Sequence, residues 1–170
     1  FNIEISRKEV VKMVEYRKIN ITDLFLNPTN PRHNPVEHQL ESIYAMIEDQ
    51  KEKLIYLARH IVENGLNPTE FVLVKFEGGK WIVREGNRRI TVLKLLNQPM
   101  LVPPEYPKIS KEFNKLSKLL DKNILKGIPC VVLDDEAEIN EWVRLKHTGQ
   151  NDGAGVVGWD GQQTSRFKAY

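Results

Sequence analysis

Residues 71–96 read FVLVKFEGGKWIVREGNRRITVLKLL and carry the densest set of structural signals in the chain. The β-branched and aromatic run at 71–76 predicts a strand, EGG at 77–79 predicts a hairpin turn, and KWIVR at 80–84 predicts the returning strand. A tight turn at 85–87 then opens a helix that runs through Leu96 and stops before Pro99. The segment therefore predicts a strand pair whose second strand turns directly into a helix.

Short strands and helices are expected on both sides of this segment. Further strands are predicted at 16–21 and 128–133. Further helices are predicted at 36–64 (one helix, or two broken near 49–51, with Gly65 as C-cap), at 110–126 with Ser110 as cap, from Asp134 or Asp135 to near Gly149, and at 162–170. This order of elements predicts an α+β fold.

The composition is that of a globular protein with one ordinary domain. The chain has 170 residues, of which 41% are hydrophobic and 28% are charged. No apolar run approaches the roughly 18 residues that a membrane span needs. The single cysteine, Cys130, excludes a disulfide framework and suits a reducing compartment, so we expect a cytoplasmic protein without a membrane partner. The net charge of +2 does not by itself indicate a nucleic-acid partner.

The chain divides into three parts. We expect an N-terminal arm at 1–15, the α+β domain at 16–133, and a third part at 134–170. The third part contains a helix, a glycine-rich loop that holds half of the chain's ten glycines, and the start of a C-terminal helical segment.

The turn at 85–89 has the residue types of an anion-binding site. A helix N-terminus offers unpaired backbone N–H groups and the positive end of the helix dipole, and both attract phosphate. Gly86 lets the backbone approach an anion closely, and Arg88 and Arg89 add fork-shaped donors. Glu85 could orient an arginine, bind a metal or act as a base. The alternative is an ordinary capped helix whose arginines lie on the surface.

Four short motifs follow one another in a set order. They are NPTNPR at 27–32, IVENG at 61–65, GNRR at 86–89 and IPCVV at 128–132. In order and spacing across 16–133 they resemble the ParB/sulfiredoxin-like (ParB-like nuclease) domain family. Its ParB branch carries an Asn-Pro-x-x-Pro-Arg box, a helix ending in glycine, a strand pair, a Gly-Glu-Arg-Arg turn into a helix and an Ile/Val-Pro-Val-like strand. The resemblance implies a small mixed sheet with flanking helices.

The resemblance also implies a ligand, because the Gly-x-x-Arg turn of this family holds the phosphates of a nucleoside triphosphate, CTP or ATP. Carried over, Gly86, Arg88 and Arg89 become phosphate ligands, Arg32 becomes a neighbouring wall, and Asn30 and Asn87 join the candidate set.

The chain departs from the family pattern at several positions. Asn87 replaces the glutamate of the ParB turn, and it also stands where sulfiredoxin needs a cysteine, which argues against sulfiredoxin activity. The family's Glu-Asn-x-x-Arg box supplies metal contacts and should fall near 147–151, where only Gln150 resembles it. Mg²⁺ is therefore left as a cofactor without assigned ligands.

Two function classes follow from the resemblance. In the first, the chain is a nucleotide-gated module of a DNA-associated protein, with DNA and a second copy of the chain as further partners. In the second, it is a phosphotransferase, nuclease or NTPase in which Glu85 is the catalytic acid or base. A third alternative is a purely structural domain whose pocket binds nothing.

A row of lysines on the helix expected at 110–126 is a second candidate surface. The row consists of Lys108, Lys111, Lys115, Lys118, Lys122 and Lys126. A spacing of three or four residues places them on one helix face, and we assign Lys111, Lys115, Lys118 and Lys122 as candidate contacts to a nucleic-acid backbone. The alternative is the solvated side of an amphipathic helix. The four histidines show no metal-ligand spacing.

Overall fold

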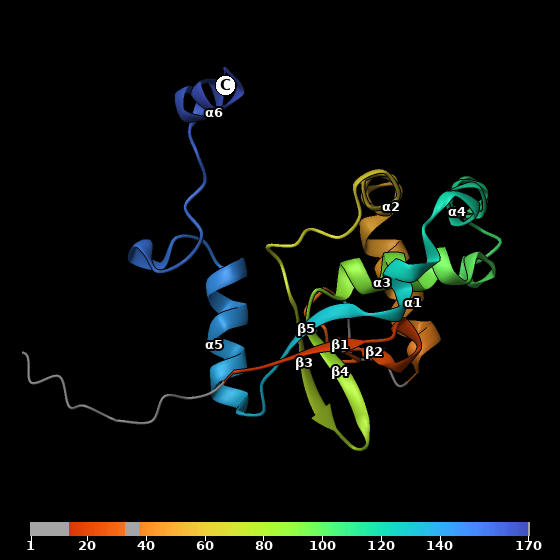
Figure 1. Cartoon of the computed structure of the whole chain (residues 1–170), viewed down its shortest axis with the longest axis horizontal. Coiled ribbons are helices and arrows are strands. Elements are labelled where there is room, and N and C mark those ends of the chain that lie inside the picture. The colour runs from red at the N-terminus through yellow and green to blue at the C-terminus, as the bar shows by residue number, and fades with distance from the viewer. Residues whose placement is uncertain (1–13, 33–37, 170) are drawn as a thin grey trace, which may run out of the picture.

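A computed structural model describes residues 14–32 and 38–169. Within them, five strands form one sheet in the order β1-β5-β3-β4-β2 (Figure 1). The strands are β1 (Glu15–Ile19), β2 (Leu24–Leu26), β3 (Val72–Glu77), β4 (Lys80–Glu85) and β5 (Ile128–Val132). The β3–β4 hairpin is antiparallel, as is the β1–β5 pair, whereas β3–β5 and β2–β4 are parallel. The α+β class with a mixed sheet and flanking helices is confirmed.

Four helices cover one face of this sheet. They are α1 (Gln39–Gln50), α2 (Lys53–Asn64), α3 (Asn87–Asn97) and α4 (Pro107–Leu119). Alternate strand residues such as Val72, Val74 and Val83 are fully buried beneath them, because successive side chains of a strand point to opposite faces. Figure 1 shows these helices grouped together, with α5 (Glu136–His147) apart from them on the other side of the strands.

The region 36–64 forms two helices, which was one of the two alternatives. Lys51 separates them with a φ of 49°, a left-handed conformation that ends α1. Gly65 ends α2 as expected: its φ is 77° and its N–H donates to the Ile61 carbonyl at 2.8 Å. The break lets both helices lie on the same core.

The single helix expected at 110–126 is wrong at both ends. It begins at Pro107, since a proline ring at the first helical position is already set to the helical φ and its missing N–H is not needed there. It ends at Leu119, because Leu120 is extended and buried in the core. Asp121 then caps a separate 3₁₀ helix, Lys122–Lys126.

The edge strand β2 is closed by a side chain. The Gln39 amide accepts the Leu26 N–H at 2.7 Å and donates to the Leu26 carbonyl at 3.0 Å. Gln39 is the first residue of α1, so this contact also fixes where α1 starts.

The part after β5 is attached to the sheet mainly through α5. Asp135 caps α5 by accepting the Glu138 N–H at 2.7 Å, and Ile139 is fully buried beneath the helix. The last helix, α6 (Gly161–Lys168), begins with a capping box between Asp160 and Gln163 and extends away from the sheet (Figure 1).

Two expectations concern the ends of the chain and the membrane. The expected N-terminal arm at 1–15 lies outside the described residues up to position 13, and Glu15 already belongs to β1. Among the helices of the described ranges, none has the length and apolar character that crossing a bilayer requires.

Candidate functional site

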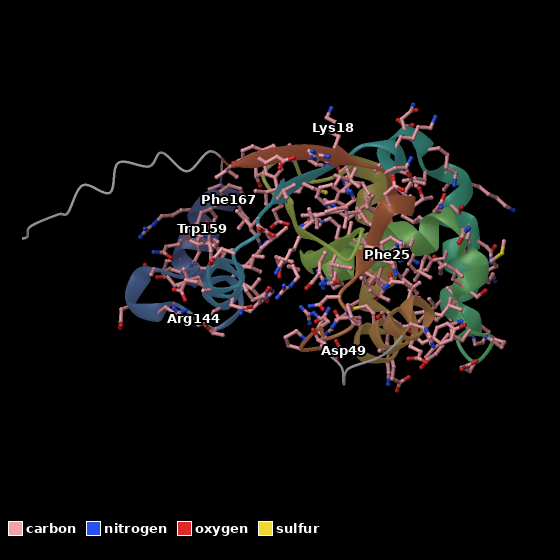
Figure 2. The ribbon with its side chains drawn as sticks, turned by 90° about the horizontal axis from the view of Figure 1, so that it is seen from below. Lys18, Phe25, Asp49, Arg144, Trp159 and Phe167 are labelled. Carbon is pink, nitrogen blue, oxygen red and sulfur yellow. The ribbon has the colours of Figure 1, made fainter. Side chains whose placement is uncertain are left out.

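A cleft of about 1020 Å³ lies where the β4–α3 turn meets the 30–32 segment and the C-terminal end of α5. Six arginine and lysine side chains line it, against three acids, so the lining favours an anion. Figure 2 shows Arg144 and Asp49 on opposite sides of this region, with many nitrogen atoms between them. The basic residues are Arg32, Arg84, Arg88, Arg89, Arg144 and Lys146.

The floor of the cleft is the N-terminus of α3. Gly86 is its N-cap and has a φ of 97° and a ψ of 15°, so it adopts the left-handed conformation that suits glycine. No side chain caps this helix end, and the first helical hydrogen bond runs from Ile90 N–H to the Gly86 carbonyl at 3.0 Å. The backbone N–H groups of residues 87–89 are thus left without an intrahelical acceptor.

The turn at Gly86 packs directly on β3. A Cβ atom at position 86 would lie 3.4 and 3.5 Å from the Val72 methyl carbons, which is ordinary van der Waals contact, so the positive φ is what favours glycine there. This packing supports the free N–H groups of α3 at the floor of the cleft.

The two arginines of the turn have different environments. Arg89 donates to the Glu70 carboxylate at 2.5 Å and to the Glu70 carbonyl at 3.2 Å, and its side chain is 14% exposed. Arg88 is half-buried and makes no side-chain hydrogen bond or ion pair with the described residues. The other five basic residues of the cleft each pair with a carboxylate. Among the basic side chains of the cleft, Arg88 is therefore the one that can bind an anion without first leaving a carboxylate partner among the described residues.

Asn87 lines the cleft, but its side chain is already used inside the fold. Its Oδ1 accepts the Asn27 N–H at 2.9 Å, and its Nδ2 donates to the Val83 carbonyl at 3.1 Å. The residue is 7% exposed. Of the atoms of Asn87, its backbone N–H remains suited to bind a ligand.

The 27–32 segment forms the opposite wall. Asn27 Oδ1 accepts the N–H and hydroxyl of Thr29, which folds the segment back on itself. Asn30 is 6% exposed; its Oδ1 accepts the Arg32 N–H at 3.1 Å, while its Nδ2 donates to no described residue. Arg32 faces Asp49 of α1 across 3.9 Å. The structure thus brings Asn30 and Arg32 to the same cleft as the turn.

Glu85 is held by two residues of α5. His147 Nε2 lies 2.6 Å from Glu85 Oε2, and Lys146 Nζ lies 3.6 Å from Glu85 Oε1. Sequence reasoning did not identify these two partners or Arg144. The one signal for them was the resemblance, which placed a second binding box near 147–151, a range that begins within the α5 residues lining the cleft.

The other end of α5 is held by a second carboxylate. Glu136 pairs with Arg84 and, at 3.0 Å, with Lys75, so it joins α5 to both strands of the hairpin. Hydrogen bonds from Arg84 and Lys75 lower the pKa of Glu136 to about 2. The Arg84 guanidinium is therefore neutralised from outside the cleft and contributes little charge to it.

The lysine row does not reach this cleft and is shorter than expected. Lys111, Lys115 and Lys118 are exposed on α4 and have no salt-bridge partner among the described residues. Lys122 lies beyond the helix and donates to Ser117 Oγ at 3.1 Å, while Lys108 pairs with Glu52. The placement of Lys122 on the same helix face is wrong.

The described residues offer neither a cluster of metal ligands nor a reactive thiol. In the described ranges, no three His, Cys, Asp or Glu side chains form a group that could hold a metal ion, so ligands for Mg²⁺ are not assigned. Cys130 is fully buried in β5, and burial raises the pKa of its thiol to about 12. A reactive thiolate is thus absent from this part of the chain.

Comparisons with known proteins find a likeness among solved structures. No protein-family model matches the chain, and no curated protein matches it. The crystal structure of the C-terminally truncated chromosome-partitioning protein ParB from Caulobacter crescentus, complexed with CTP-γ-S, superposes with a TM-score of 0.45 at 18% identity. The match covers 81% of this chain and 54% of that one, so this chain spans about half of the ParB structure. These values are too low to transfer a ligand or an activity from that protein.

Proposed function

We propose that this domain binds a nucleotide, with its phosphates on the turn at 85–89. The observation that carries the proposal is the α3 N-terminus: a left-handed Gly86 instead of a capping side chain, next to an arginine without a partner among the described residues. Backbone N–H groups at a helix N-terminus and an arginine fork are two donor types suited to phosphate oxygens. The order of sequence motifs supports a nucleoside triphosphate, CTP or ATP, as the phosphate-bearing ligand.

The walls of the cleft support the same ligand. Asn30 lines the cleft, and its Nδ2, which donates to no described residue, is a donor that a ligand in the cleft can use. Arg32 and Lys146 stand on opposite walls, each held by one carboxylate, and both add positive charge near a phosphate chain. A cleft of about 1020 Å³ is at the upper end of the range of roughly 300–1,000 Å³ for small-molecule sites.

Calorimetry with CTP, ATP and inorganic tripolyphosphate, with and without Mg²⁺, tests this proposal. Arg88→Ala is expected to weaken binding by about 10- to 100-fold, because a charge-assisted hydrogen bond contributes roughly 1.5–3 kcal/mol. Arg88→Lys should recover part of the loss, since a point charge cannot reproduce the guanidinium fork.

A matched control is Arg166→Ala on α6, which removes the same charge from an exposed site outside the cleft. Equal affinities of Arg88→Ala and the parent, or a parent that binds none of the three compounds, would refute the phosphate site.

An enzymatic function is the second candidate, favoured by the contact between Glu85 and His147. A carboxylate and an imidazole in hydrogen-bond contact inside one cleft form a pair in which either group can take up or release a proton. We propose that such an enzyme would cleave or transfer a phosphate, with Glu85 as the acid or base. Glu85→Gln separates the candidates: an enzyme loses phosphate release but keeps nucleotide binding, whereas a binding module shows no phosphate release in either form.

A further inference from the structure

A second cavity, of about 340 Å³, lies beneath the opposite flank of α5, between that helix and the outer face of the sheet. Its walls are mainly apolar, in contrast to the basic cleft. They include Phe71, Leu73, Val131, Leu133, Trp142 and Val143. The volume is at the lower end of the range for small-molecule sites, roughly 300–1,000 Å³.

This cavity adjoins the cleft described above. Glu85, Val143 and Lys146 line both spaces, so the Glu85–Lys146 ion pair stands at the boundary between them. Leu73 pairs in register with Glu85, and Glu85 immediately precedes Gly86. The apolar cavity thus begins one residue away from the turn that offers its N–H groups to phosphate.

Two large aromatic side chains at the cavity are partly exposed among the described residues, and one of them, Phe71, also packs on the ring of Tyr16 at 5.0 Å between centroids. Trp142 is 55% exposed and Phe71 is 42% exposed, although both line an apolar space. Exposed aromatic surface around a cavity is characteristic of a binding site. An aromatic ring that enters the cavity would cover this surface and gain a stacking partner in the indole of Trp142.

We propose that this cavity receives the base of the nucleotide whose phosphates lie on the turn at 85–89, and that Trp142 stacks on it. The inference rests on the proposed phosphate site, because Glu85 and Lys146 line both spaces and so place the cavity beside that site. It makes the ligand bipartite: the polyphosphate is bound by α3 and the arginines, and the heterocyclic base is bound by α5 and the sheet. Trp142 is then a specificity-determining residue for compounds that carry a planar base.

The test compares a nucleotide with its bare phosphate chain. Stacking of a base on an aromatic side chain implies that Trp142→Ala weakens ATP or CTP binding by about 5- to 100-fold. The same variant should leave the affinity for tripolyphosphate unchanged, since that compound has no base. Trp142→Phe keeps an aromatic face and should restore most of the nucleotide affinity. Trp159→Ala is the matched control, because Trp159 is also an exposed tryptophan, at 63% against 55% for Trp142, and packs on Phe167 outside both cavities.

Each outcome has one meaning. The inference is overturned if Trp142→Ala leaves the ratio of nucleotide to tripolyphosphate affinity as in the parent, whether or not both affinities change. It is also overturned if Trp142→Ala alters the oligomeric state by light scattering while that ratio stays constant, because a second copy then covers the indole. Tripolyphosphate binding that depends on Arg88 would leave the phosphate site standing in both cases.

Discussion

The side-chain oxygen of Asn87 accepts the backbone N–H of Asn27 at 2.9 Å, and so connects two segments that are 60 positions apart. The same amide donates to the Val83 carbonyl, which ties the 27–32 wall of the cleft to the end of β4. A residue of the turn at 85–89 therefore fixes the distance between the floor and the wall of the cleft.

Replacing Asn87 with alanine should destabilise the fold. The change leaves the buried Asn27 N–H without an acceptor, which costs about 1–3 kcal/mol. Urea denaturation of Asn87→Ala and the parent measures the difference in the free energy of unfolding. Asn114→Ala is the control, because Asn114 is exposed on α4 and bonds within its own helix. Similar destabilisation of both variants would show that the Asn87–Asn27 hydrogen bond adds no stability of its own.

Glu136 should make stability depend on pH in the acid range. Its pKa is lowered in the folded protein from the ordinary 4.5 to about 2, so its pairing with Arg84 and Lys75 is fully present above pH 4.5. The contribution is lost as the pH falls toward 2, because the folded state must then take up a proton that the unfolded state already holds. The difference in unfolding free energy between the parent and Glu136→Gln should therefore shrink from pH 5 to pH 2. A difference that stays constant over this range would show that the pairing adds no stability.

Cys130 should be inert in the folded protein. Its side chain is fully buried, so a reagent cannot reach the sulfur. Its pKa is raised to about 12, so the thiol is not ionised to the reactive thiolate at neutral pH. A chromogenic disulfide reagent is expected to label it in denaturant and to leave it unlabelled in buffer. Rapid labelling of the native protein would show that β5 opens.

The lysines of α4 give a prediction for nucleic acid. If Lys111, Lys115 and Lys118 bind a phosphate backbone, their joint replacement by alanine should weaken binding to any duplex. The slope of log affinity against log salt should flatten by about one unit for each lysine that no longer neutralises a phosphate. Joint replacement of Lys18, Lys53 and Lys168 removes the same charge from other exposed sites and serves as the control. Equal effects of the two triple variants would make the α4 row a solvated helix face.

The local elements of the fold were predictable where sequence signals agree. The strand run at 71–76, the Gly78-Gly79 turn and the apolar spacing after Arg89 each specify one element, and the structure contains all three. The ends of α4 were not predictable from apolar spacing alone, because Leu120 keeps that spacing but leaves the helix to fill the core. Spacing shows that a side chain is buried and does not show which backbone conformation buries it.

Only part of the candidate site was predictable: the turn at 85–89 and the segment 27–32, but not the residues of α5. The turn at 85–89 and the 27–32 box stood out in the sequence, since glycine, proline and arginine have special backbone or charge properties. The contact of His147 with Glu85 spans 62 positions and depends on how α5 lies on the sheet, which no local pattern encodes. The side chain of Asn87 was equally hidden, because an asparagine at a helix start can face a ligand or the protein interior, and here it faces inward.

Gln39 has a consequence for how the sheet can grow. Its amide takes both backbone groups of Leu26 that a neighbouring strand would use, so β2 cannot accept another strand at that position. The opposite edge is β1, whose residues Glu15 to Lys18 are all exposed and whose outer side pairs with no described strand. Among the described strands, the outer side of β1 is therefore the edge that remains available to a further extended segment, whereas Gln39 blocks β2 at Leu26.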